Sequence, residues 1–201
     1  MIAILDYGAG NLFSVKNALS YLGESYIITN DIREIERADS YILPGVGAFP
    51  FAMHMLQETK IIDVLKKQVQ SKPLLGICLG MQMLFEESTE FEVTKGLGFI
   101  PGKVDYMQVA PLKIPHMGWN ALRFYQPNHP LLQHITEGDC VYFVHSYQAN
   151  TSSEYLVASC EYGNEVPALV SRGNVFGAQF HPEKSGETGL QILRNFGGLT
   201  K

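Results

Sequence analysis

The first half of the chain alternates short apolar runs with amphipathic stretches. Such apolar runs are typical of strands buried in a parallel sheet, and the amphipathic stretches are typical of helices that cover the sheet. The pattern therefore predicts a series of βαβ units. The expected strands are Ile2–Leu5, Ser25–Thr29, Tyr41–Leu43 and Pro73–Ile77, and the expected helices are Leu12–Leu22, one or two within Phe51–Val69, and Leu79–Glu87.

The pattern changes after Gly96 to shorter strands separated by Gly, Pro and Asn, which is typical of antiparallel pairing. Val141–Val144 and Val175–Phe180 are the strongest strand predictions there, and Gly189–Phe196 predicts a closing helix. We see no internal repeat and no linker. We therefore expect one α/β domain over residues 1–201, with a central, mostly parallel sheet flanked by helices and additional antiparallel strands in the C-terminal half.

Composition and charge argue against several functional classes. The net charge is −5 and the 15 Lys and Arg are scattered, so the basic surface of a nucleic-acid-binding protein is not expected. No apolar run approaches the roughly 20 residues of a membrane-spanning helix. The N-terminus lacks the basic region of a signal peptide, and an odd count of three cysteines favours free thiols over disulfides. We expect a cytoplasmic protein that acts on a small molecule.

The six histidines show no spacing that is typical of metal ligands. Neither a His-x-x-x-His nor a Cys-x-x-Cys pattern occurs, so we expect no metal site, and no cofactor is predicted.

Residues 76–80 read Gly-Ile-Cys-Leu-Gly, after a predicted buried strand and before a predicted helix. This is the context of a nucleophile elbow, in which glycines allow a sharp turn to expose a reactive side chain. Cys78 is therefore the candidate nucleophile, although a buried cysteine of the core is the simpler alternative. Cys140 and Cys160 lie in strand-like runs without flanking glycines, so we expect both to be core thiols.

A thiol nucleophile needs a proton acceptor, which can come from a distant part of the chain. His181 directly follows the predicted strand Val175–Phe180, and Glu183 could orient its imidazole if the chain bends there. His145 also ends a strand, so residue chemistry alone leaves both histidines open as the base. The remaining histidines are expected to be structural or at the surface: His54, His116, His129 and His134.

Acyl transfer also needs donors for an oxyanion. The amide of Leu79 is one candidate because it follows the nucleophile. The amide of Val46, in the turn formed by residues 44–47 (Pro-Gly-Val-Gly), is a second candidate, although an ordinary turn at the end of a strand is the simpler interpretation. Trp119, the single tryptophan, is by composition expected to be a partly buried core residue, although aromatic anchors are also enriched at interfaces.

These motifs together resemble the class I glutamine amidotransferases over essentially the full chain. Residues 76–82 (GICLGMQ) resemble the nucleophile motif of that family, residues 180–183 (FHPE) its His-x-Glu motif, and residues 44–47 its oxyanion segment. Within the class, three further segments resemble the glutaminase subunits of imidazole glycerol phosphate synthases in histidine biosynthesis: residues 6–11 (DYGAGN), 115–120 (PHMGWN) and 181–185 (HPEKS).

The resemblance implies a flavodoxin-like fold and a Cys78–His181–Glu183 triad that hydrolyses L-glutamine through a glutamyl thioester. It favours His181 over His145 as the base. The glutamine-binding positions that it implies are Gly47, Gln82, Glu90, His145, Ser146 and Tyr147.

The resemblance also implies a partner. No residues remain for a domain that uses the ammonia, so a separate (βα)8-barrel synthase subunit is expected to receive it in a heterodimer. The implied interface positions are Asn11, Trp119, Tyr142 and Lys184. The alternatives are a glutaminase subunit of another class I amidotransferase, a non-catalytic regulatory subunit, and a cysteine hydrolase that works alone.

Overall fold

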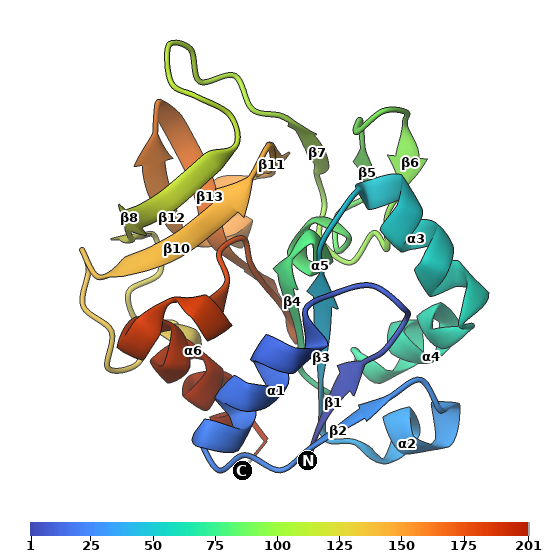
Figure 1. The fold of residues 1–201 in the computed structure, drawn as a ribbon. Coiled ribbons are helices and arrows are strands. Elements are labelled where there is room, and N and C mark those ends of the chain that lie inside the picture. Colours follow the sequence, from blue (N-terminus) through green and yellow to red (C-terminus); the bar gives the residue numbers. More distant parts are fainter. Residues whose placement is uncertain (201) are drawn as a thin grey trace.

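The computed structural model describes residues 1–200, which are built around an eight-stranded sheet (Figure 1). The strand order is β2-β1-β3-β4-β14-β13-β12-β9. Pairing is parallel from β2 to β14 and antiparallel from β14 to β9, so the predicted mixed α/β sheet is confirmed. The strands are β1 (Ile2–Leu5), β2 (Tyr26–Thr29), β3 (Ser40–Gly45), β4 (Leu74–Cys78), β9 (Arg123–Phe124), β12 (Leu156–Tyr162), β13 (Asn164–Arg172) and β14 (Val175–Ala178).

Helices cover both faces of this sheet, with α1 and α6 on one side and α2, α3 and α4 on the other (Figure 1). Strand β1 shows how the sequence produces two cores. Ile2 and Ile4 pack into the core under α1 and α6, whereas Ala3 and Leu5 pack into the other core, because successive side chains of a strand point to opposite faces. The helices are α1 (Leu12–Tyr21), α2 (Ile32–Arg37), α3 (Phe49–Glu58), α4 (Ile61–Gln68), α5 (Leu79–Gln82) and α6 (Gly186–Gly198).

Two smaller sheets stand beyond the carboxyl ends of the parallel strands (Figure 1). One pairs two antiparallel strands, and the other joins four short strands in the order β11-β7-β5-β6. The first contains β8 (His116–Ala121) and β10 (Cys140–His145), and the second contains β5 (Glu87–Ser88), β6 (Thr94–Lys95), β7 (Lys103–Tyr106) and β11 (Tyr147–Asn150). Short 3-10 turns are η1 (Pro130–Leu132), η2 (Ser153–Tyr155) and η3 (Pro182–Lys184).

The helix predicted over Leu79–Glu87 is wrong beyond Gln82, where α5 ends. Leu84 and Phe85 are fully buried, and their carbonyl groups accept hydrogen bonds from the amides of residues 98–100. Those bonds replace the ones that a longer helix would have made. The periodicity suggested an amphipathic helix, but residues 79–85 are all buried.

Other predictions differ in smaller ways. The short helix α2 was not predicted, although Asp31 caps its N-terminus by accepting from the amides of Arg33 and Glu34. The stretch Phe51–Val69 forms two helices, α3 and α4, which are separated at Lys60 with a φ of 60°. None of the helices within residues 1–200 combines the length and apolar character needed to cross a membrane.

Cys140 is exposed, so its prediction as a core thiol is wrong. It is the first residue of β10, and its side chain alternates to the outer face of the β8–β10 sheet. Cys160 is fully buried, as predicted.

Candidate functional site: a cysteine at a strand-to-helix turn

Cys78 is the last residue of β4, and α5 begins at the next residue. Its backbone has a φ of 55° and a ψ of −111°, a conformation that residues with a side chain rarely adopt. Such a strained residue persists only where the surrounding structure holds it in place. The geometry is that of a nucleophile elbow, at the position that the sequence pattern predicts.

Two glycines let this turn pack against its neighbours. A Cβ atom on Gly76 would lie 2.5 Å from the carbonyl oxygen of Gly80, and one on Gly80 would lie 1.9 Å from the carbonyl oxygen of Leu43 on β3. Both distances are far inside van der Waals contact. The glycines that flank Cys78 are therefore required by close backbone approach, which fixes where the thiol is presented.

His181 approaches Cys78 from the end of β14, three residues after the last residue of that strand. The chain bends through η3 directly after His181, so the expected bend is present. His181 Nδ1 lies 2.8 Å from Glu183 Oε1, and the side chains are only 4% and 1% exposed. His181 and Cys78 line the same cleft, and interaction with Cys78 is among the causes that raise the pKa of His181. The three residues therefore form a cysteine–histidine–carboxylate row.

The electrostatics of the row favour a protonated imidazole. Burial lowers the pKa of His181, but its hydrogen bonds and charge interactions with Cys78 and Glu183 outweigh burial and raise that pKa to about 9. An imidazolium at neutral pH stabilises a neighbouring thiolate and can protonate a leaving group.

His145, the rival base, is occupied elsewhere. Its Nδ1 lies 2.8 Å from the carbonyl oxygen of Tyr147, and its Nε2 lies 3.0 Å from His116 Nδ1. Burial is the main cause that lowers the pKa of His145 to about 3. With both ring nitrogens engaged, His145 has none free for Cys78, so the geometry favours His181 as the base.

A cleft of about 350 Å³ opens over the thiol. Both oxyanion candidates and every position expected to bind glutamine line this cleft, as do His181 and Lys184. Glu183 is not part of the lining and contacts His181 from behind. Sequence reasoning did not single out Pro115 and Val144, which also line it. The lining residues are Val46, Gly47, Cys78, Leu79, Gln82, Glu90, Pro115, Val144, His145, Ser146, Tyr147, His181 and Lys184.

Glu90 supplies a carboxylate to the cleft. Its Oε2 accepts a hydrogen bond from the amide of Phe49, at the first turn of α3, at 2.7 Å. Burial raises the pKa of Glu90, and that hydrogen bond acts in the opposite direction. A half-buried carboxylate suits the ammonium group of an amino-acid ligand, because the charge is partly desolvated and already oriented.

Gln179 is a contact of the nucleophile that sequence reasoning missed. It is fully buried, its Nε2 lies 4.0 Å from Cys78 Sγ, and its Oε1 accepts from Gln82 Nε2 at 3.1 Å. The available signal was a polar residue inside the apolar run before His181, since a buried amide needs partners.

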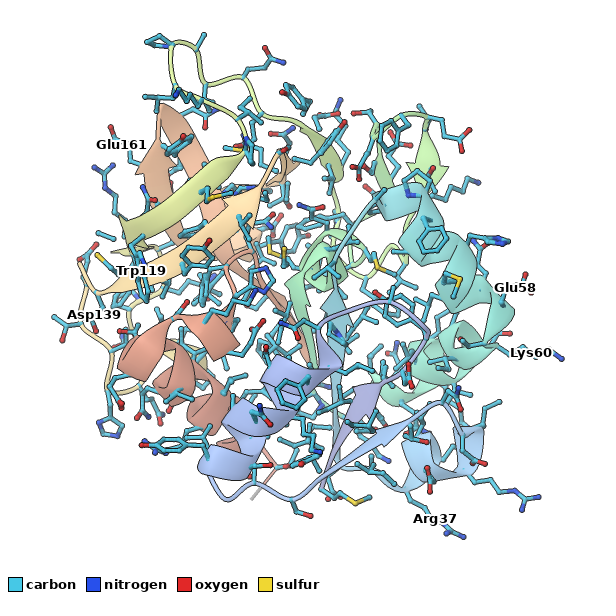
Figure 2. All side chains as sticks on the ribbon, in the orientation of Figure 1. Arg37, Glu58, Lys60, Trp119, Asp139 and Glu161 are labelled. Atoms are coloured by element: carbon cyan, nitrogen blue, oxygen red, sulfur yellow. The ribbon has the colours of Figure 1, made fainter. Side chains whose placement is uncertain are left out.

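Of the four residues expected at a partner interface, Lys184 lines this cleft, whereas Asn11, Trp119 and Tyr142 lie outside its lining. Trp119 is 55% exposed, so the expectation of a core tryptophan is wrong. It lies opposite Tyr142 in the β8–β10 pair, with ring centroids 5.9 Å apart, and Figure 2 shows it on the side of the molecule away from Glu58. Asn11 caps α1 and lines a narrow recess together with Glu183.

Comparison with known proteins agrees with this geometry. Residues 3–198 match the family described as glutamine amidotransferase class-I. The chain belongs to the class I glutamine amidotransferases. This amidotransferase is 54% identical over 202 residues to an imidazole glycerol phosphate synthase subunit HisH of Bacillus cereus, which covers 100% of the chain and 96% of the relative. A protein of the same name from Bacillus cytotoxicus is 52% identical, with the same coverage.

Solved structures share the fold at lower sequence identity. A crystal structure of a glutamine amidotransferase has a TM-score of 0.75 at 22% identity and covers 98% of both chains. The structure of PurLQS from Thermotoga maritima has a TM-score of 0.74 at 22% identity and covers 100% of this chain and 98% of that one. The expected α/β amidotransferase fold is confirmed.

The raised pKa of His181 leads to a prediction for this amidotransferase. Activity should fall as the pH rises through about 9, because the imidazolium is then lost. Glu183→Gln removes one cause of the raised pKa while keeping an oxygen that can accept from Nδ1. We therefore expect the descending limb of the kcat/KM profile to move to lower pH by about one unit or more.

The matched control is Glu187→Gln, which removes the same charge from an exposed position on α6. Its profile should coincide with that of the unmodified protein. A Glu183→Gln profile with an unmoved limb would show that Glu183 does not act on the titrating group.

Proposed function

We propose that this amidotransferase is the glutaminase subunit of imidazole glycerol phosphate synthase. The observation that carries the proposal is the 54% identity, over the full chain, to relatives of that name. The Cys78–His181–Glu183 row in an amino-acid-sized cleft supports the glutaminase chemistry. In this proposal the glutaminase is a single domain of residues 1–201, acting in the cytoplasm without a metal or cofactor.

The reaction divides into two steps at the thiol. Cys78 Sγ attacks the side-chain amide carbon of L-glutamine, and the amides of Val46 and Leu79 stabilise the oxyanion. His181 donates its proton to the departing nitrogen, so ammonia leaves and a γ-glutamyl thioester remains. Water then attacks the thioester with His181 as base, which releases glutamate and regenerates the thiolate. Glu183 keeps the imidazole oriented throughout.

The cleft offers groups for both ends of the substrate. Glu90 faces the α-ammonium group, and Gln82 and Gly47 border the cleft on the side of the elbow. His145, Ser146 and Tyr147 form the adjoining wall, where Gln82 Nε2 donates to the Tyr147 carbonyl oxygen and where Ser146 and Tyr147 contribute largely through their backbone. These assignments rest on position in the cleft and on the charge of a free amino acid.

The ammonia passes to a second protein in this proposal. That partner is a (βα)8-barrel synthase subunit, which docks as a heterodimer on the face around Asn11, Trp119, Tyr142 and Lys184 and makes imidazole glycerol phosphate and aminoimidazole carboxamide ribotide. An exposed tryptophan beside a tyrosine is a typical anchor of such an interface.

The turn at Val46 provides a means of control. Val46 is exposed, and a Cβ added to Gly47, whose φ is 99°, would meet nothing within 4 Å. The Val46 N–H belongs to the peptide between Gly45 and Val46, and rotation of that peptide in this exposed turn would aim the amide toward or away from the oxyanion position. In this proposal the docked synthase and its nucleotide ligand favour the first orientation, so glutamine is not hydrolysed wastefully.

A titration with the synthase subunit tests this proposal. Glutamate release should be low for the chain alone and rise as the liganded synthase is added. Trp119→Ala should raise the synthase concentration needed for half-maximal activation by about tenfold or more. Phe51→Ala, which removes an exposed aromatic from α3 instead, should leave the titration unchanged.

Other outcomes point to the alternatives. Rapid glutamate release without the synthase would favour a hydrolase that works alone. A synthase that neither binds nor changes the rate would indicate a glutaminase subunit of another amidotransferase.

A further inference from the structure

A row of hydrogen bonds extends inward from strand β8, and its outer half centres on a histidine pair. Asn120 Nδ2 donates to the carbonyl oxygen of Glu161 at 2.9 Å, and Asn120 Oδ1 lies 2.7 Å from His116 Nε2. The other ring nitrogen of His116, Nδ1, lies 3.0 Å from His145 Nε2. The two histidines are opposite each other in the β8–β10 pair.

The inner half of the row ends at the nucleophile. His145 Nδ1 donates to the carbonyl oxygen of Tyr147 at 2.8 Å, and Gln82 Nε2 donates to the same oxygen at 3.0 Å. Gln82 Nε2 also donates to Gln179 Oε1 at 3.1 Å, and Gln179 Nε2 lies 4.0 Å from Cys78 Sγ. Side chains and one carbonyl group therefore connect His116 to the thiol without a gap.

His116 has no role in the glutaminase steps described above, although it occupies a demanding position. It is fully buried, and its ring is stacked on Phe143 and Tyr162, with centroids 4.7 Å and 4.0 Å away. Phenylalanine would suit such a slot better on packing grounds, because a buried imidazole must be hydrogen-bonded to avoid a desolvation cost. The polar contacts of His116 are thus its distinguishing property.

The positions of the ring hydrogens show that neutral histidines keep the hydrogen bond between His116 and His145. The carbonyl oxygen of Tyr147 can only accept, so His145 Nδ1 carries a hydrogen and His145 Nε2 is free to accept from His116 Nδ1. The bond from His116 Nδ1 to His145 needs only neutral rings, whereas a second donation from His116 Nε2 to Asn120 Oδ1 would need a protonated ring. Burial lowers the pKa of both histidines, which favours the neutral pair. The link from His116 through His145 to Tyr147 is therefore complete without added charge.

We propose that His116 is a positioning residue for glutamine hydrolysis. It fixes the ring of His145, which holds the Tyr147 carbonyl and, through it, Gln82. All three of these partners line the cleft over Cys78, so His116 acts on the substrate wall without touching the substrate. The proposal rests on the proposed function, in which that wall binds glutamine. Strand β8, which contains His116, also exposes Met117 and Trp119 on its outer face. The strand therefore connects the proposed docking face with this wall of the cleft.

Two substitutions at this position separate positioning from packing. His116→Phe keeps an aromatic ring in the slot but removes both ring hydrogen bonds. His116→Gln fits the slot less well but retains an amide that can donate to His145 Nε2. Positioning predicts that the phenylalanine variant is the more impaired, whereas a role in packing alone predicts the reverse order.

The experiment uses the chain assembled with its synthase subunit and measures glutamate release against glutamine concentration. We expect His116→Phe to raise KM about tenfold with kcat within about threefold, and His116→Gln to keep KM within about threefold of the unmodified value. A loss of folded protein would instead lower kcat at constant KM, so thermal unfolding of each variant is followed in parallel.

The remaining outcomes are also decisive. An unmodified KM in His116→Phe, or failure of both variants to fold, would overturn the proposal. Failure of the phenylalanine variant alone to fold, with an active glutamine variant, would support it. If the unmodified complex released no glutamate, or Cys78→Ala released as much, the proposed function would have failed instead, and the assay separates these cases.

Discussion

Replacing Cys78 with alanine is expected to lower glutamine-dependent turnover of the assembled synthase by about 10⁴-fold or more. The substitution removes the only group at the elbow that can form the thioester. It keeps a Cβ atom at the same unusual φ of 55°, so it adds no backbone strain to the folded state. Turnover with added ammonium salts should be unchanged, because the synthase subunit then receives its ammonia directly.

Cys140→Ala is the matched control for loss of a thiol. Cys140 is exposed at the start of β10 and lies outside the cleft, so its removal should leave both activities unchanged. Product formation is followed with glutamine and with ammonium in separate assays. Retention of glutamine-dependent turnover in Cys78→Ala would contradict a catalytic role and favour a regulatory subunit.

Gly80→Ala is expected to be the most destabilising single change in the elbow. The added Cβ would lie 1.9 Å from the carbonyl oxygen of Leu43 and 2.9 Å from its carbonyl carbon. Both are backbone atoms of a central strand and cannot move aside as a flexible side chain could. We expect a loss of about 3–5 kcal/mol in the free energy of unfolding, a large share of the stability of a typical domain.

Gly198→Ala provides the comparison. Gly198 is exposed near the end of α6, and a Cβ there would meet nothing within 4 Å. Its unfolding free energy should change by no more than about 1 kcal/mol, with a small gain from helix propensity. Urea unfolding followed by circular dichroism measures both. Equal stability of the two variants would mean that the elbow does not pack against β3 as described.

The amino-acid sequence determined most of the sheet. Ile2–Leu5 and the run before Cys78 could be assigned as buried strands because these apolar runs are too short for a typical helix and are followed by turn signals. The nucleophile elbow could also be predicted from the sequence, because its strand, its glycines and its cysteine follow one another directly in the chain. The resemblance of the motifs to class I amidotransferases added the family, which the comparisons then showed.

The local sequence pattern gave wrong predictions where the environment of a residue is formed by distant segments of the chain. Residues beyond Gln82 have helical periodicity, but their carbonyl groups bond to the amides of residues 98–100. Cys140 resembled a core residue, yet its alternation in a two-stranded sheet turns it to solvent. In both cases the decisive contacts join segments that are distant in sequence.

The choice between the two candidate bases also depends on contacts between distant parts of the chain. His145 ends β10 and His181 follows the end of β14 by three residues, and residue chemistry alone gave His181 only a small lead. The fold gives His181 a carboxylate on one nitrogen and the thiol as a further partner, and engages His145 with His116 and a carbonyl group. The sequence by itself determined the strands, the elbow and its cysteine, because those depend on neighbouring residues. The family resemblance already favoured His181 over His145, and only the tertiary structure gave the contacts of each histidine, because hydrogen-bond partners are selected by positions in space.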